Sequence, residues 1–212
     1  MARFLFVRHA THDLLTKKII AGRRPGVHLN ELGQKQAQEI VRALARMPID
    51  AVYCSPLERA CETAAPLLKQ LGLPLQTAEE FNEIDFGDWT GQAFADLDRL
   101  PEWQRWNSFR SGTVAPNGES MLEVQARALR KIYELEHQHR VVAIFSHGDV
   151  IRAMIAHFVG LHLDLLARIE IVPASVSVID VSRDGSKLLL VNGAAAAAAE
   201  VTGLVRADTT AC

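Results

Sequence analysis

Two histidines in this sequence each come directly after a short apolar run. Arg8-His9 follows the run at 4–7, and His147 follows the run at 141–145 and one serine. Arg59 lies in the first turn of a helix that is predicted to begin after the apolar run at 51–54. Two arginines and two histidines suit a dianionic tetrahedral oxyanion, because arginine donates paired hydrogen bonds to phosphate and keeps its charge. These residue types therefore indicate phosphate chemistry.

The apolar runs are typical of strands that are buried on both faces of a sheet. In open α/β sheets, ligands bind beyond the carboxyl ends of the strands. His9, His147 and Arg59 are therefore expected at one edge of the sheet. The amide groups that begin the Arg59 helix point the same way and favour an anion.

Helical periods alternate with these strands along the chain. Ser55 and Glu58 predict a capping box with Pro56 at the first helical position, and Ser120 and Glu123 predict a second one. The expected helices span 30–46, 55–71, 120–139 and 149–159, and an expected strand pair spans 175–181 and 187–191. The alternation predicts a three-layer α/β/α sandwich with a mostly parallel central sheet.

Two segments differ from this pattern. Residues 88–119 hold all three tryptophans and are expected to form a small helical insertion, or cap, over the sheet edge. Residues 193–212 include a run of six alanines and are expected to be a frayed helix or a flexible tail. The remaining chain, 1–192, is expected to be one domain.

The composition is that of an ordinary globular protein. The 212 residues are 49% hydrophobic and 23% charged, with a formal net charge of -2, so no basic excess favours nucleic acid or an anionic membrane. The first apolar run is too short for a signal peptide or a membrane span. Cys54, Cys61 and Cys212 lack metal-ligand spacing and are typical of free thiols, which indicates a cytoplasmic location.

The sequence resembles the histidine phosphatase superfamily, which is also called phosphoglycerate mutase-like. Five motifs of the family are matched in the family's order, and the resemblance runs from about residue 3 to residue 192. The matching segments are Arg8-His9-Ala10, Ser55-Pro56-Leu57-Glu58-Arg59-Ala60-Cys61-Glu62-Thr63-Ala64, Phe81-Asn82-Glu83-Ile84-Asp85-Phe86-Gly87-Asp88-Trp89-Thr90-Gly91, Gly118-Glu119-Ser120 and Ser146-His147-Gly148. Segments 21–30 and 173–178 resemble an actinobacterial branch of phosphatases and phosphomutases.

The resemblance implies a metal-free hydrolysis of a small phosphomonoester. It assigns His9 as the nucleophile that becomes a phosphohistidine, and Glu83 as the general acid, with Asp85 as a rival carboxylate. It further implies that the phosphoryl oxygens are held by a set of basic and glycine residues. That set is Arg8, Arg59, His147, Gly148, Gly22 and Arg23. No cofactor is expected.

The sequence departs from the family's pattern around the nucleophile. Ala10 stands in place of the usual glycine. Several relatives carry small polar residues three and six positions after the nucleophile, where this chain has His12 and Leu15. The imidazole of His12 has a donor for phosphate, and the side chain of Leu15 has none.

Several alternatives stay open at this point. The chain is expected to take a small phosphorylated metabolite, as a phosphatase, as a phosphomutase, or as a binding protein without turnover. A metal site built from His9, His12 and His147 lacks the usual ligand spacing. Trp103 and Trp106 either line a substrate pocket or anchor the insertion. The sequence also leaves open whether the protein is a homodimer.

Overall fold

The central feature of the computed structural model is a six-stranded sheet with the strand order β3-β2-β4-β1-β5-β6. The structure describes residues 1–208. β1, β2, β3 and β4 run parallel to one another, whereas β5 pairs antiparallel with both β1 and β6. The strands are β1 (Ala2–Arg8), β2 (Ala51–Cys54), β3 (Gln76–Thr77), β4 (Val141–Ser146), β5 (Val176–Ser182) and β6 (Gly185–Gly193).

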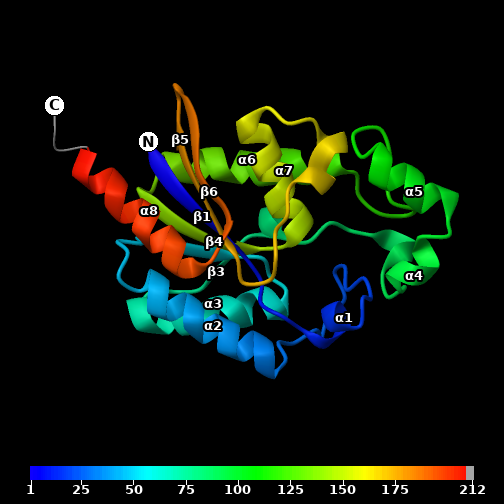
Figure 1. Ribbon diagram of the computed structural model, residues 1–212, viewed down its shortest axis with the longest axis horizontal. Helices are drawn as coiled ribbons and strands as arrows, with labels where there is room; N and C mark the ends of the chain where they lie inside the picture. The colour runs from blue at the N-terminus through cyan, green and yellow to red at the C-terminus, as the bar shows by residue number, and fades with distance from the viewer. Residues whose placement is uncertain (209–212) are drawn as a thin grey trace.

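Helices cover both faces of this sheet, as Figure 1 shows. The α-helices are α1 (Asp13–Thr16), α2 (Glu31–Leu44), α3 (Glu58–Leu71), α4 (Phe94–Leu97), α5 (Pro101–Ser108), α6 (Met121–Glu136), α7 (Gly148–Val159) and α8 (Ala195–Asp208). Short 3-10 helices span Glu79–Phe81, Gly87–Trp89 and Leu163–Arg168.

Alternation along β1 divides the core in two. Phe4 and Phe6 pack with residues of α6, α7 and the insertion, whereas Leu5 and Val7 pack with residues of α2, α3 and α8. Successive side chains of a strand point to opposite faces, so a fully apolar strand needs a helical layer on each side. The expected three-layer α/β/α sandwich with a mostly parallel sheet is confirmed.

The two predicted capping boxes have different outcomes. Ser120 caps α6 as predicted, with both reciprocal bonds to Glu123 present. The prediction at Ser55 is wrong, because α3 begins at Glu58 after an N-cap leucine without a side-chain cap bond. Ser55 Oγ instead lies 2.7 Å from His147 Nε2, and Glu58 Oε1 accepts the Gly26 N–H at 3.0 Å. Both side chains therefore bind residues elsewhere in the fold, and neither forms the predicted capping box.

The insertion forms the two short helices α4 and α5, which lie beyond one end of the sheet (Figure 1). Its tryptophans pack on one another. The Trp103 and Trp106 rings are stacked 5.5 Å apart, and the Trp89 ring meets both edge-on at 5.0 and 5.6 Å. All three are buried. This cluster joins the insertion to the hydrophobic core.

The C-terminal segment, expected to be a frayed helix or a flexible tail, forms a helix over most of its described residues. Residues 195–208 form α8, and Ala198 is fully buried against α2 and the sheet. The alanine run favours a helix, and its small side chains let that helix pack closely. Cys212 lies outside the described residues. Cys54 and Cys61 are free, with their sulfur atoms 3.5 Å apart.

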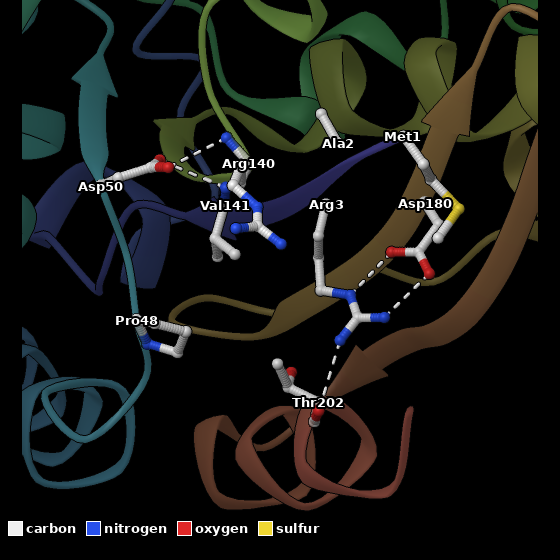
Figure 2. A pocket seen from close by; sticks show the side chains of 9 residues that line it. All are labelled: Met1, Ala2, Arg3, Pro48, Asp50, Arg140, Val141, Asp180 and Thr202. Atoms are coloured by element: carbon white, nitrogen blue, oxygen red, sulfur yellow. Dashed lines mark hydrogen bonds and ion pairs between the residues drawn. The ribbon is translucent and has the colours of Figure 1, made fainter. Parts of the chain in front are cut away.

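A buried ion pair ties the first strand, β1, to β5, and a hydrogen bond ties it to α8. Arg3 Nε and NH2 donate to the two carboxylate oxygens of Asp180 on β5 at 2.6 and 2.8 Å, and Arg3 NH1 donates to the Thr202 carbonyl of α8 at 3.3 Å. Figure 2 shows these bonds beside a cavity of about 560 Å³. Since Ala2 and Val141 begin their strands there, this cavity lies at the amino ends of β1 and β4.

Among residues 1–208, none of the helices combines the length and apolarity that crossing a bilayer requires.

We predict that Asp180→Ala lowers the free energy of unfolding by about 3–5 kcal/mol, because the Arg3 guanidinium would stay buried without its counter-charge. Urea denaturation measures this loss. Asp184→Ala, on the exposed turn between β5 and β6, is the matched control, with an expected change within about 0.5 kcal/mol. Equal stabilities for the two variants would contradict the prediction.

Candidate active site

A second cavity of about 130 Å³ lies at the opposite end of the sheet, where β1 and β4 end. Arg8, His9 and Arg59, which the sequence singled out, line this cavity, whereas the larger cavity in Figure 2 is lined by none of them and by no histidine. Its lining comes from five segments of the chain. The lining residues are Arg8, His9, His12, Leu15, Ile19, Ile20, Ala21, Gly22, Arg59, Glu83, Phe86, Phe94, Gly148, Asp149 and Arg152.

His9 is held in one tautomer. Its Nδ1 lies 2.9 Å from the carbonyl oxygen of Ala10, and a carbonyl only accepts, so Nδ1 carries the proton. The Nε2 lone pair is then available for attack. Burial, and next the charges of Arg59 and Arg8, hold the pKa of His9 well below its ordinary value. The imidazole is therefore neutral at neutral pH, as a nucleophile needs.

Arg59 is buried and Arg8 is half-buried, and both cations have unused, buried hydrogen-bond donors. Arg8 NH1 donates to the Ile171 carbonyl at 2.6 Å, and Arg59 NH2 donates to the Gly22 carbonyl at 2.8 Å. Within the described part of the chain, Arg8 Nε, Arg59 Nε and Arg59 NH1 are buried without any partner. Buried donors of this kind are rare in native proteins unless a ligand satisfies them. Both side chains line the cavity, so an anion there would bind them.

Two glycines lie beside these cations. Gly22 has a φ of +50°, and a Cβ there would lie 2.7 Å from Thr90 Oγ1. Its carbonyl is the partner of Arg59. Gly148 is the first residue of α7, and a Cβ there would lie 3.4 Å from the Arg8 guanidinium carbon.

The helix end that faces the cavity belongs to α7. Gly148 and Asp149 line the cavity, and the N-cap of α7 makes no side-chain cap bond, so the first amides of this helix are open to an anion. We expected the beginning of α3 to do this. That expectation is wrong, because α3 contributes only the Arg59 side chain to the cavity lining.

Glu83 is the carboxyl group of the cavity. Burial raises its pKa to about 7, although the charge of Arg59 opposes the shift. Its Oε1 accepts the Ile84 N–H at 3.0 Å, and its Oε2 lies 3.6 Å from His147 Nδ1. Asp85, the rival carboxylate, does not line the cavity, since its Oδ1 accepts the Gly87 N–H at 2.9 Å. The structure therefore favours Glu83 as the acid.

Arg23 was expected to bind phosphate or substrate, and the structure places it elsewhere. Its Nε donates to the Glu83 carbonyl at 2.7 Å, and its NH2 pairs with Glu119 at 2.9 Å. Arg127 makes a similar pair of contacts, to Glu119 and to the Glu83 carbonyl. Arg23 does not line the cavity. Instead, both arginines hold the backbone that carries the Glu83 carboxyl.

His147 lies behind the cavity wall. Its ring is fully buried, is 5.2 Å from the His9 ring, and is not among the cavity lining. Its Nε2 lies 2.7 Å from Ser55 Oγ, and its Nδ1 lies 3.3 Å from Arg59 NH2. Burial, and next the charge of Arg59, lower the pKa of His147 well below its ordinary value. In this structure the ring contacts Arg59 and Glu83.

His12 does line the cavity, with its ring 5.1 Å from the ring of His9. Its Nδ1 accepts the Leu15 N–H at 3.2 Å, which caps α1. The neutral ring therefore carries its proton on Nε2. Burial, and next the charge of Arg59, lower the pKa of His12 to about 4. His12 is thus a neutral donor, whereas Leu15 adds an apolar surface.

Sequence reasoning did not identify two features around the site, namely the ion pairs of Asp149 and the contacts of Arg127. Asp149 pairs with Arg110 and Arg152, both at 3.0 Å, and these charges hold its pKa at about 2 although burial raises it. The i, i+3 spacing of Asp149 and Arg152 on a predicted helix signalled their pair. The contacts of Arg110 and Arg127 join distant segments, so the sequence held no local signal for them.

Among the described residues, no three possible metal-ligating side chains gather at one place.

Comparison with known proteins places this geometry in a family. The family model of the histidine phosphatase superfamily (branch 1) matches residues 4–193. The adenosylcobalamin/alpha-ribazole phosphatase of Escherichia coli K12 is 29% identical over 197 residues, which cover 91% of this chain and 97% of that protein. Phosphoserine phosphatase 1 of Hydrogenobacter thermophilus is 29% identical over 199 residues, covering 91% and 92%.

The fold leads to the same family. The structure of a mycobacterial glucosyl-3-phosphoglycerate phosphatase in complex with VO3 superimposes with a TM-score of 0.82 at 25% identity, covering 92% of this chain and all of that one (100%). The family match, the shared fold and the motifs at the ends of β1, β2 and β4 agree: the chain belongs to the histidine phosphatase superfamily.

Proposed function

We propose that this protein hydrolyses small phosphomonoesters without a metal, through a phosphohistidine on His9. The unpartnered buried donors of Arg8 and Arg59 carry the proposal, because they face a cavity that also holds a neutral imidazole and a carboxyl group. The named relatives are phosphatases of this family, which supports the same reaction.

In the first step, His9 Nε2 attacks phosphorus in line with the ester oxygen. The N–P bond forms as the P–O bond breaks, and the departing alcohol oxygen takes the Glu83 proton. A pKa of about 7 suits this transfer, since a general acid works best with a pKa near the operating pH.

In the second step, the Glu83 carboxylate takes a proton from water, and the water oxygen attacks phosphorus. The P–N bond breaks, inorganic phosphate leaves, and both His9 and Glu83 return to their starting protonation states. Arg8, Arg59 and the first amides of α7 hold the phosphoryl oxygens while charge moves between the attacking and leaving groups.

His12 supplies a further donor for these oxygens through its Nε2–H. His147 positions Arg59 and Glu83, which it contacts at 3.3 and 3.6 Å. A small phosphorylated metabolite is the expected ligand. A cytoplasmic location stays a prediction, and whether the protein is a homodimer stays open.

We predict that the wild-type protein hydrolyses p-nitrophenyl phosphate in the presence of a chelator, and that His9→Ala abolishes this activity because no other group can accept the phosphoryl group. Release of nitrophenol measures turnover, and gels run at neutral to alkaline pH detect a phosphorylated wild-type chain, because the N–P bond of phosphohistidine is labile in acid. Loss of activity with the chelator would overturn the metal-free mechanism. Conversion of 3-phosphoglycerate to its isomer without phosphate release would establish a mutase instead.

We predict that kcat/KM for an alkyl phosphate falls as the pH rises above about 7, because Glu83 loses the proton that the leaving alcohol needs. The pH–rate profile measures this limb. Glu83→Gln is expected to remove the limb and to lower kcat about 10²- to 10⁴-fold, with a smaller loss for an aryl phosphate, whose leaving group needs less protonation. A limb that persists in Glu83→Gln would assign it to another group.

We predict that His12→Asn lowers kcat/KM at least about tenfold, because the asparagine side chain is too short to bring its N–H donor to the phosphate. Its amide oxygen still accepts the Leu15 N–H, so the cap of α1 is kept. The melting temperature should stay close to that of the wild type. Unchanged kcat/KM in a folded variant would remove His12 from the phosphate site.

A further inference from the structure

One wall of the cavity beside Glu83 is apolar. Leu15, Ile19, Ile20, Phe86 and Phe94 all line the same cavity as the catalytic groups. Phe94 is 38% exposed, although it is a large hydrophobic residue. An exposed apolar side chain next to a catalytic pocket gains contact area when an apolar group binds there.

The backbone holds this wall in place. The two segments that carry Ile19, Ile20 and Phe94 hydrogen-bond to each other. Ile20 N donates to the Gln92 carbonyl at 2.9 Å, Gly91 N to the Ile20 carbonyl at 2.8 Å, and Phe94 N to the Lys18 carbonyl at 3.0 Å. The backbone hydrogen bonds between these two segments therefore hold the wall in place before substrate binds.

The tryptophan cluster supports the wall from behind. The Phe94 ring lies 5.9 Å from Trp103, and the Phe86 ring lies 5.7 Å from Trp106. Neither Trp103 nor Trp106 lines the cavity, so of the two alternatives for these tryptophans the anchoring one is borne out by the structure. Aromatic packing of this kind keeps the two phenylalanines in fixed positions.

The polar side chains of the cavity either form ion pairs with each other or are assigned to the phosphoryl group. Asp149 and Arg152 are paired at 3.0 Å, and Arg152 Nε also donates to the Ile169 carbonyl at 2.8 Å. Arg8, His9, His12, Arg59 and Glu83 are assigned to the phosphoryl group and its transfer. A leaving group rich in hydroxyls would lose water on the apolar wall without gaining partners, which is unfavourable.

We propose that the wall formed by Leu15, Ile19, Ile20, Phe86 and Phe94 selects phosphomonoesters of compact apolar alcohols over those of polyhydroxy alcohols. This proposal rests on the proposed function. It concerns the alcohol part of the substrate, and the phosphoryl group is bound as described above. Each methylene that becomes buried on the wall should raise kcat/KM up to about fourfold.

A matched pair of substrates tests this preference. n-Butyl phosphate and erythritol 4-phosphate have the same four-carbon skeleton and a primary alcohol as leaving group, and differ in three hydroxyls. We expect kcat/KM to be at least tenfold higher for the butyl ester and to rise from methyl to butyl phosphate. Phosphate release measures both. O-Phosphoserine is the charged comparison, and it is expected to be a poorer substrate than butyl phosphate.

Variants of the wall test the same inference. Phe94→Ala should reduce the kcat/KM ratio of butyl to methyl phosphate at least about threefold, and Leu15→Asn should reduce the ratio of butyl to erythritol phosphate. Phe109→Ala is the control, because Phe109 has a similar exposure of 44% and does not line the cavity. That variant should keep both ratios.

The outcomes separate this inference from the function on which it rests. If the protein hydrolyses no ester, not even p-nitrophenyl phosphate, the proposed phosphatase function is wrong. Turnover with equal or greater kcat/KM for the erythritol or serine ester would overturn the apolar preference alone. So would wall variants whose ratios match those of Phe109→Ala.

Discussion

The site depends on keeping nitrogens of two arginine side chains buried while several of them have no partner. An unsatisfied buried donor destabilises the fold by about 1–3 kcal/mol, and more for a charged group. Arg3 shows the ordinary solution, a bidentate pair with Asp180. Among the residues that the structure describes, no such carboxylate pairs with Arg8 or Arg59, and Arg8 Nε, Arg59 Nε and Arg59 NH1 have no hydrogen-bond partner. A phosphoryl group would satisfy them, which is why this instability can be functional.

The burial of His9 and Glu83 sets the protonation states that the reaction needs. Burial favours the neutral form of His9 and of Glu83, which shifts their pKa values in opposite directions. The neighbouring arginines push the pKa of His9 further down. They also oppose the rise for Glu83, yet burial dominates there. One dry environment therefore yields a neutral nucleophile and a protonated acid together.

The surrounding fold holds these groups still. Arg23 and Arg127, both anchored on Glu119, fix the backbone of Glu83 through its carbonyl. The tryptophan cluster does the same for the apolar wall through Phe86 and Phe94. Residues outside the cavity thus determine where the acid and the leaving group meet.

The sequence alone predicted most helices and every strand of the sheet except the two-residue β3, because apolar runs are local signals. The ordered motifs singled out Arg8, His9, Arg59 and Glu83. It misassigned Ser55, whose partner His147 lies far away along the chain. Arg23 binds Glu119 and the Glu83 carbonyl, contacts that no local pattern predicts. Which helix end faces the cavity, the burial that sets the pKa of Glu83, and the apolar wall were decided only by the tertiary structure. Each of these depends on desolvation and on contacts between distant segments, and no local pattern encodes them.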